Sequence, residues 1–280
     1  MIRKLLFMLI ALCFLLSCGG DDPMIEQPVD PVVPEQPENP NDPDNSEDVK
    51  TKKIKTINIE WPNEACFFNI EFLYDKTKKL EKVVYHNSEG NGEKSISYQS
   101  DLMTFFDYQQ NGNSTDRDTS YIKLDRNGLI ENMDGDYGGI ISFVYENGFL
   151  RKSQYVRDDG SFYMQTEFIY SENNLAQIID GNSGPFEKPK FHYTKYDNKA
   201  HIFPFLIDYD GMMTDDYNFL FHYMGLYGKC STKLEESVIN NYSQFSFSYT
   251  FDEDGYPTKI QRKGSKDNDN DYVASINYYE

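Results

Sequence analysis

The stretch Phe143-Val-Tyr-Glu-Asn-Gly-Phe-Leu150 contains the end of one β-strand, a two-residue turn and the start of a second strand. An Asn-Gly pair readily adopts the two positive φ angles that a tight hairpin turn needs. Aromatic side chains, Phe143 and Tyr145, occupy alternate positions before the turn, which places them on one face of the hairpin, against a core. The stretch therefore predicts an antiparallel hairpin between strands that are consecutive in the chain.

Looser copies of this hairpin recur. Each has alternating aromatic or leucine residues, then an acid, then a turn residue, as in 121–125 with Gly128 and 249–252 with Gly255. Degenerate copies lie at 72–80 and at 168–175, where Asn174 takes the glycine position. The turn dipeptides are Asn111-Gly112, Asn127-Gly128, Asn147-Gly148, Asp159-Gly160 and Asp254-Gly255. We expect the acid of each copy to accept hydrogen bonds from its turn amides.

Four further segments alternate with a period of two, which puts their larger side chains on one face. These side chains are Phe245, Phe247, Tyr249 and Phe251 in 243–251, Phe68, Ile70, Phe72 and Tyr74 in 67–74, Phe162, Met164, Phe168 and Tyr170 in 162–170, and Tyr272, Ala274, Ile276 and Tyr278 in 272–279. The predicted fold is all-β, a curled or barrel-like antiparallel meander of hairpins in one domain, residues 51–280. A chain of roughly 230 residues is long enough to bury one core.

One segment departs from this pattern. In 214–225 the residues Tyr217, Leu220, Phe221 and Met224 recur at spacings of three and four, as on one face of a helix. Thr214 would cap the start, and Gly225 or Gly228 would end it. We predict one short helix that plugs an open end of the sheet.

The first residues predict export. Arg3 and Lys4 precede an apolar run, residues 5–16, which is shorter than the ~20 residues of a transmembrane helix, so 1–17 read as a signal peptide. The run ends in Leu15-Leu16-Ser17-Cys18, which resembles the bacterial lipobox, where the signal is cut before a cysteine that becomes acylated. The resemblance implies that Cys18 is lipidated and anchors the chain. The alternative is an ordinary secretory signal followed by an incidental cysteine.

The residues after Cys18 bear on location. Gly19-Gly20-Asp21-Asp22 resembles the export tag that carries Bacteroidetes lipoproteins to the outer face of the outer membrane, although these acids could simply begin an acidic linker. The resemblance implies a lipid-anchored outer-membrane protein that is exposed at the cell surface rather than facing the periplasm. Residues 18–50 are rich in proline and acid, which predicts a disordered tether of about 3.1 Å per residue, on the order of 90 Å in all.

Charge and cysteine content limit the partners. The formal charge is -19, and loss of the two cationic residues of the signal would bring it to -21, so phosphate-rich nucleic acid would be repelled and is excluded as a partner. Cys13 leaves with the signal and Cys18 is the predicted anchor, which leaves Cys66 and Cys230 in the folded region. Export permits a disulfide between Cys66 and Cys230, and two separate buried thiols are the alternative.

Candidate catalytic and metal-binding residues are sparse. The four histidines lack HExxH or zinc-cluster spacing, and no GxSxG elbow occurs; the histidines are His86, His192, His201 and His222. The run 181–184, Gly-Asn-Ser-Gly, reads as a loop. The run 267–271 places acids as in an EF-hand loop, but Tyr272 and Tyr278 stand where Gly and Glu are needed. We predict no catalytic residue, no metal and no cofactor, with a cell-surface hydrolase of polysaccharide or peptide as the alternative.

The 22 tyrosines and 20 phenylalanines leave two interpretations open. Exposed rings stack on sugars or on apolar partners, whereas rings on the buried face of a sheet pack against each other across strands. The first interpretation predicts a glycan or protein ligand, and the second predicts a core. The oligomeric state cannot be read from the sequence.

Several short motifs carry a resemblance to a known family. They are Tyr196-Asp197-Asn198-Lys199-Ala200, Phe203-Pro204, Gly225-Leu226, Ser231-x-Lys233-Leu234, and Phe251-Asp252 through Tyr256-Pro257. Together they resemble a Bacteroidetes lipoprotein family of unknown function with a porin-like β fold, over roughly residues 54–280. The hairpin phrase is also similar to the tyrosine-aspartate repeats of large bacterial surface and toxin-shell proteins. Neither resemblance supplies a catalytic residue, and we predict a non-catalytic binding or structural module.

A membrane-embedded barrel is a further interpretation. It conflicts with the lipobox and with polar residues such as Gln244 and Ser248, which lie opposite the aromatic face of their strand. Lipid outside and an aromatic core inside would leave these polar groups without water.

Overall fold

The computed structural model describes residues 51–62, 66–88, 90–111, 114–135, 138–180, 189–207, 218–240, 243–265 and 271–280. These residues belong to one compact unit, Lys50–Glu280. The predicted signal, Cys18, the tether, the loop 181–184 and the acidic residues 267–270 lie outside the described residues.

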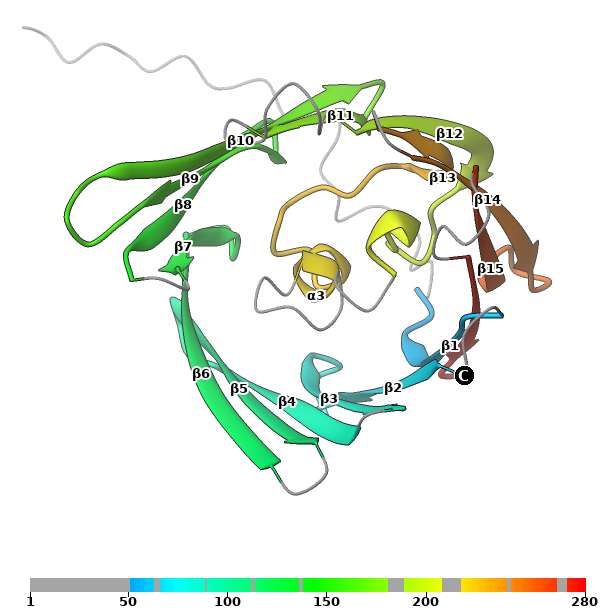
Figure 1. Cartoon of the computed structure of the whole chain (residues 1–280), viewed down its shortest axis with the longest axis horizontal. Helices are drawn as coiled ribbons and strands as arrows, with labels where there is room; N and C mark the ends of the chain where they lie inside the picture. Colours follow the sequence, from blue (N-terminus) through cyan, green and yellow to red (C-terminus); the bar gives the residue numbers. More distant parts are fainter. Residues whose placement is uncertain are drawn as a thin grey trace, which may run out of the picture. The chain divides into compact units, whose positions relative to one another are not determined.

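Sixteen antiparallel strands form a closed barrel, in which each strand pairs with its neighbours in the chain and β1 pairs with β16 (Figure 1). The strands are β1 Ile54–Glu60, β2 Phe67–Tyr74, β3 Leu80–Asn87, β4 Gly90–Tyr98, β5 Leu102–Asn111, β6 Ser114–Leu124, β7 Ile130–Asp134, β8 Ile140–Glu146, β9 Phe149–Val156, β10 Phe162–Ser171, β11 Asn174–Asp180, β12 Lys190–Asp197, β13 Lys233–Ile239, β14 Gln244–Phe251, β15 Pro257–Gly264 and β16 Tyr272–Tyr278. The predicted all-β meander of hairpins is confirmed. We call the end where β1 begins the N-terminal end of the barrel; odd-numbered strands begin there and even-numbered strands end there.

Acidic side chains organise the turns at the N-terminal end. Asp75 Oδ1 accepts hydrogen bonds from the amides of Thr77 and Lys79 at 2.7 and 2.9 Å. Asp125 and Asp252 accept the same pair of bonds, from the amides two and four residues further on. The hydroxyl of Thr77 and these amides lower the pKa of Asp75. The expectation that the acid of each repeat bonds its turn amides is confirmed for these three turns.

The degenerate repeat at 168–175 differs from the prediction. Glu172 and Asn173 hold the positive φ angles, 51° and 62°, while Asn174 already pairs with Ser171 as the first residue of β11. The assignment of Asn174 to the glycine position is therefore wrong, because a two-residue turn needs both of its central residues in the left-handed region. In the other degenerate copy, Lys78 adopts the positive φ, at 64°.

Inward tyrosines join five strands to their neighbours and a sixth, β8, to the plug. Six even-numbered strands carry a tyrosine that packs against the core and donates its hydroxyl to a backbone carbonyl; the bonds are Tyr74 to Ile54, Tyr98 to Leu80, Tyr145 to Leu226, Tyr193 to Leu175, Tyr249 to Glu235 and Tyr278 to Pro257. Burial raises the pKa of these hydroxyls, that of Tyr98 to about 12. The recurrent aromatic of the repeat thus has a structural role.

Period-two burial follows the predicted faces with one exception. The aromatic residues of β14 pack against the core while Gln244, Ser246 and Ser248 are exposed, and β2 and β16 behave in the same way. Phe162 was predicted to share the inward face of β10, but it is 57% exposed. The register with β9 shifts between Phe162 and Met164, and this irregularity turns the Phe162 ring outward.

The interior is filled by an insertion between β12 and β13. Sixteen strands enclose more space than their own side chains can fill. The missing core comes from residues 198–207 and 218–232, which we call the plug and which lie inside the ring of strands in Figure 1. The plug contains η2 Pro204–Leu206 and α3 Asn218–Tyr223 and buries Ile202, Phe203, Ile207, Phe219, Leu220, Phe221, Leu226 and Tyr227.

The predicted helix is confirmed for Asn218–Tyr223, inside the barrel rather than only at an open end. Gly225 ends it with a φ of 73°, and the Leu226 amide bonds back to the Phe221 carbonyl. The predicted cap, Thr214, lies outside the described residues.

Polar contacts fix the plug to the wall. The Tyr272 hydroxyl donates to the Pro204 carbonyl at 2.7 Å, and the Tyr223 hydroxyl accepts from the Ile54 amide at 3.0 Å. The Glu235 carboxyl accepts from the Phe205 amide at 2.9 Å. These bonds connect both parts of the plug to β1, β13 and β16.

One strand edge is open at the opposite end of the barrel. The edge of β6 that faces β7 pairs only through Ile122, Lys123 and Leu124. In the part of the chain that the structure describes, neither β7 nor β8 pairs with the rest of this edge. Asp116 and Asp118 each accept a hydrogen bond from the next residue's amide, at 2.8 and 2.7 Å. These carboxylates occupy edge amides that would otherwise be open to another strand.

Candidate functional site

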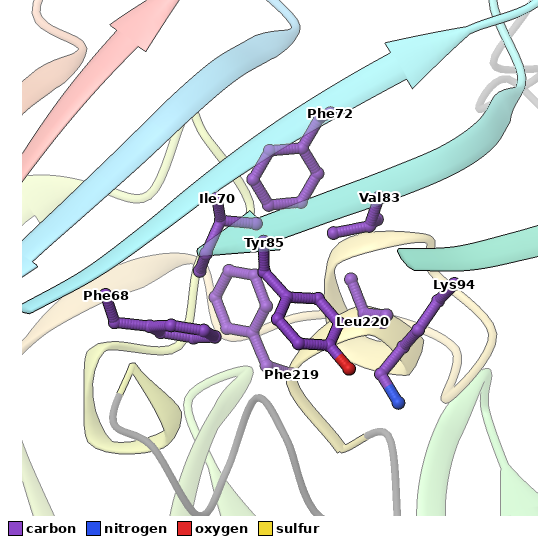
Figure 2. A pocket seen from close by; sticks show the side chains of 8 residues that line it. All are labelled: Phe68, Ile70, Phe72, Val83, Tyr85, Lys94, Phe219 and Leu220. Atoms are coloured by element: carbon purple, nitrogen blue, oxygen red, sulfur yellow. The ribbon is translucent and has the colours of Figure 1, made fainter. Parts of the chain in front are cut away.

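The barrel interior is a packed core. Figure 2 shows Phe219 and Leu220 of the plug facing Tyr85 and Lys94 of the wall around a void of about 10 Å³, room for about one water molecule. Lys94 is buried in an ion pair with Asp107, whose other oxygen receives a 3.4 Å hydrogen bond from Tyr85. Charged groups here are therefore paired side chains within a core.

The outer face is polar on β4 and β14. The outward residues of β4 and β14 are exposed or half-buried and carry amides, hydroxyls and a carboxylate: Asn91, Glu93, Ser95, Ser97, Gln244, Ser246, Ser248 and Thr250. A transmembrane barrel has the reverse arrangement, with apolar residues outside and polar residues inside. Exposed apolar residues do occur in register on β8, β9 and β10, where Ile140 pairs with Val156 and Val156 with Phe162. Among the described residues, no helix has the length and apolar character required to cross a bilayer.

A cleft of about 540 Å³ opens at the N-terminal end of the barrel. Its walls are the two ends of the plug, residues 198–201 and 229–232, together with Phe149 of β9, Asn173 of the β10–β11 turn and Asp197 of β12. The volume lies within the range of about 300–1,000 Å³ that is usual for small-molecule sites. The cleft therefore marks the place where the plug enters and leaves the barrel.

Hydrogen bonds hold the cleft walls in place. The Asn198 side chain is buried, donates to the carbonyls of Ile202 and Ser231 at 2.7 and 3.2 Å, and accepts from the Ile202 amide at 3.1 Å. Ser231 Oγ accepts from the Leu175 amide at 3.1 Å and lies 3.0 Å from the Tyr193 hydroxyl. The two ends of the plug are thus connected to each other and to β11 and β12.

Two lysines bring positive charge to the cleft. The Lys229 amide donates to the Gly148 carbonyl at 2.7 Å, and its ammonium lies 5.4 Å from the centre of the Phe149 ring. Lys199 donates to the Asp254 carbonyl at 2.7 Å. The only acid that lines the described cleft, Asp197, forms an ion pair with Lys233 at 2.5 Å. The lining is therefore cationic in a chain whose formal charge is -19.

The two histidines and the cysteine near the cleft, His201, His222 and Cys230, are neutral at pH 7. Burial and the nearby Lys53 lower the pKa of His201. Burial lowers the pKa of His222 to about 4 and raises the pKa of the Cys230 thiol to about 11. Cys230 donates to the His222 carbonyl at 3.3 Å, and the His222 ring stacks on Phe203. A protonated, half-buried thiol is a poor nucleophile, so Cys230 and the stacked His222 have the character of packing residues, whereas His201 is exposed.

The predicted site residues fall in different places. Cys18 lies outside the described residues. Cys66 is an exposed free thiol just before β2, and Cys230 is a free thiol just before β13, so the two cysteines lie toward opposite ends of the barrel and no disulfide joins them. His86 bonds Asn91, and His192 is exposed on β12. Within the described ranges, no cluster of three histidine, cysteine or acidic residues could hold a metal ion.

Sequence reasoning missed the cleft lysines and Asn198 as site residues. The family-like motifs 196–200 and 231–234 lie on either side of the predicted helix, and the structure brings them together at the cleft. The position of these two motifs on either side of the helix is the feature of the sequence that could have indicated the cleft. The aromatic residues mostly pack inward against the core, and the cleft has no exposed tyrosine among its lining residues. Core packing is therefore the main use of the rings.

The fold resembles two solved structures. One is a porin-like protein from Bacteroides uniformis, with a TM-score of 0.62 and 14% identity over 81% of this chain and 96% of that chain. The other is a porin-like protein from Bacteroides vulgatus, with a TM-score of 0.54 and 14% identity over 81% of this chain and 99% of that chain. No protein family and no curated protein matches the sequence. The expected porin-like fold is confirmed, and the lipoprotein family and the repeat type stay predictions.

Proposed function

We propose that this chain is a lipid-anchored protein of the outer membrane, exposed at the cell surface, whose plugged barrel binds a ligand and catalyses no reaction. The observation that carries the proposal is the placement of polar residues outside and apolar residues inside a filled barrel. Among the described residues, the filled core leaves no aqueous channel, and the mainly polar outer face is the reverse of the apolar band that lipid contact requires. The cleft beside the plug is then the concave surface available to a ligand.

The anchor rests on the sequence. The lipobox-like residues before Cys18 and the acidic residues after it support acylation and export to the outer face. Acyl chains stabilise membrane association by about 0.8 kcal/mol for each buried methylene group. The porin-like neighbours from Bacteroides support an outer-membrane setting. A polar outer face suits a barrel that a tether keeps in water.

Cys18→Ala tests the anchor. The variant should move from the membrane fraction to the soluble fraction of cells, because it lacks the thiol that is acylated. The unchanged chain should be cleaved when intact cells are treated with a protease, as a surface protein would be. Membrane retention of Cys18→Ala would count against acylation, and protection from protease in intact cells would count against surface exposure.

Binding without catalysis is tested with the full chain after the signal, made as Cys18→Ser to avoid acylation. The chain is applied to panels of glycans and peptides, and both retention and product formation are measured. We expect retention of a ligand that is recovered unchanged. Release of shortened glycans or peptides would instead support a hydrolase.

A further inference from the structure

We infer that the cleft beside the plug takes a small organic anion with hydroxyl groups, for which an acidic sugar such as a uronic acid is the fitting class. The inference rests on the proposed binding function and adds the chemistry of the ligand. Its basis is the contrast between the cleft, lined by Lys199 and Lys229, and a chain with a formal charge of -19.

The cationic side chains at the cleft outnumber the acid that lines it. Asp197 is that acid; it forms an ion pair with Lys233 at 2.5 Å, and Lys233 and, to a smaller extent, Lys199 lower its pKa. Lys199 also bonds a backbone carbonyl, and Lys229 lies over an aromatic ring, so the described contacts leave an excess of positive charge in the cleft. Cations in a concave surface attract an anion more strongly than the same cations on a flat surface.

The position of Lys229 is set before any ligand arrives. Its backbone amide is bonded to Gly148, and a β-carbon at Gly148 would approach the Lys229 side chain to 3.1 Å, so the stem lies directly over the β8–β9 turn. Gly228, with a φ of 82°, brings this segment into a bridge with Phe149. A side chain positioned in this way loses less conformational entropy when it binds.

Groups that suit hydroxyls line the same cleft as the two lysines. The Asp197 side chain is 65% exposed, and Lys233 bonds only its Oδ1, which leaves Oδ2 able to accept from a ligand hydroxyl. The Thr232 hydroxyl donates to Asn174 and can still accept a hydrogen bond. An ammonium for a carboxylate, with acceptors for hydroxyls near it, is the pairing that a uronic acid offers.

A matched pair of sugars tests the inference. The Cys18→Ser chain is titrated by calorimetry with D-galacturonate and with D-galactose, which differ in the carboxylate. We expect galacturonate to bind at least tenfold more tightly and to weaken as salt is raised, because its contact is ionic. Lys229→Gln should weaken galacturonate binding by about tenfold, the usual effect of losing one hydrogen bond to a charged group.

Controls separate the inference from the proposed function. Lys259→Gln, on the outward face of β15, should leave galacturonate binding unchanged, and thermal unfolding of both variants should match the parent. Equal affinity for the two sugars, or full binding by Lys229→Gln, would overturn the anionic preference while ligand binding stood. Absence of galacturonate binding at millimolar concentration, with a neutral ligand retained on the glycan panel, would also overturn it. Absence of any retained ligand would instead remove the proposed function.

Discussion

Replacing Glu235 by Gln should stabilise the protein at neutral pH. Glu235 is 1% exposed, and one of its carboxyl oxygens accepts from the Phe205 amide. Among the described residues its Oε1 has no hydrogen-bond partner. Burial raises the pKa of Glu235 from 4.5 to about 8. A glutamine keeps the size and the acceptor for Phe205 but has no charge to bury.

The magnitude follows from the two pKa values. The folded state keeps the proton up to about pH 8, whereas the unfolded chain releases it near 4.5, so the stabilising contribution of the neutral acid is complete below 4.5 and is lost as pH rises to about 8. Between pH 4.5 and pH 8 the free energy of unfolding of the parent loses about 5 kcal/mol through Glu235, and about 3 kcal/mol of this is already lost at pH 7. Glu235→Gln does not lose this free energy, so the difference in the free energy of unfolding between the variant and the parent should be about zero at pH 4.5 and should increase as the pH rises to about 8.

The assay is urea unfolding of the Cys18→Ser parent and its Glu235→Gln variant at several pH values between 4.5 and 8.5. The difference between the two free energies of unfolding isolates Glu235 from other groups. His222 acts in the opposite direction, because its pKa, lowered from 6.5 to about 4, makes the neutral folded form lose stability as pH falls below 6.5. His222 is present in both chains, so its effect cancels in the difference.

Glu236→Gln is the matched control. Glu236 is the next residue of β13 and is exposed, so the same substitution should change the free energy of unfolding little at any pH. The reasoning is refuted if the advantage of Glu235→Gln does not change with pH. It is also refuted if Glu235→Gln is less stable than the parent at pH 8.

Three further variants test contacts that connect the plug to the barrel wall or protect a strand edge. Tyr223→Phe leaves the first amide of β1 without its acceptor and should cost about 1–3 kcal/mol in urea unfolding, while the exposed Tyr121→Phe should cost little. Asn198→Ala removes two hydrogen bonds to Ile202 and the one to Ser231 that joins the two ends of the plug, and it should cost about 2–4 kcal/mol in the same assay. Joint replacement of Asp116 and Asp118 by Ala opens the β6 edge and should raise the oligomer fraction in size-exclusion chromatography with light scattering; an unchanged elution profile would contradict edge protection.

The fold could be predicted from the sequence wherever local signals and burial agree. The period-two aromatics of β14, the Asn147-Gly148 turn and the acid of Asp252 each specify a hairpin through contacts within a few residues. Consecutive hairpins then predict a meander. Closure of the barrel is a pairing of β1 with β16, between the two ends of the folded region, and no local pattern encodes it.

The predictions for Phe162 and Asn174 are wrong because the strand pairing around them departs from the regular pattern. Phe162 fits the alternation of its neighbours, yet the irregular pairing with β9 turns it outward. Asn174 fits the position of a turn glycine, yet the left-handed residues are Glu172 and Asn173. A one-residue shift reverses the face of a strand residue, and only the pairing with the next strand fixes that shift.

The cleft could not be predicted because its walls come from distant parts of the chain. Lys229 and Asn198 lie at the two ends of the plug, and Phe149 comes from the β8–β9 turn. The sequence marks each segment with a separate short motif, and only folding places them together. The charge balance of the cleft depends in the same way on the pairing of Asp197 with Lys233.

The plug explains why a porin-like fold here favours a binding site over a pore. A mainly polar outer face leaves most apolar side chains of the described strands pointing inward, and sixteen strands surround a space that those side chains cannot close alone. The chain fills it by sending residues from the end of β12 into the barrel and back out to β13 at the same end. Because the plug enters and leaves at the same end of the barrel, its two ends must pass side by side between the turns of that end. The cleft with Lys229 lies where they pass, so the filling of the core produces the concave surface on which binding is proposed.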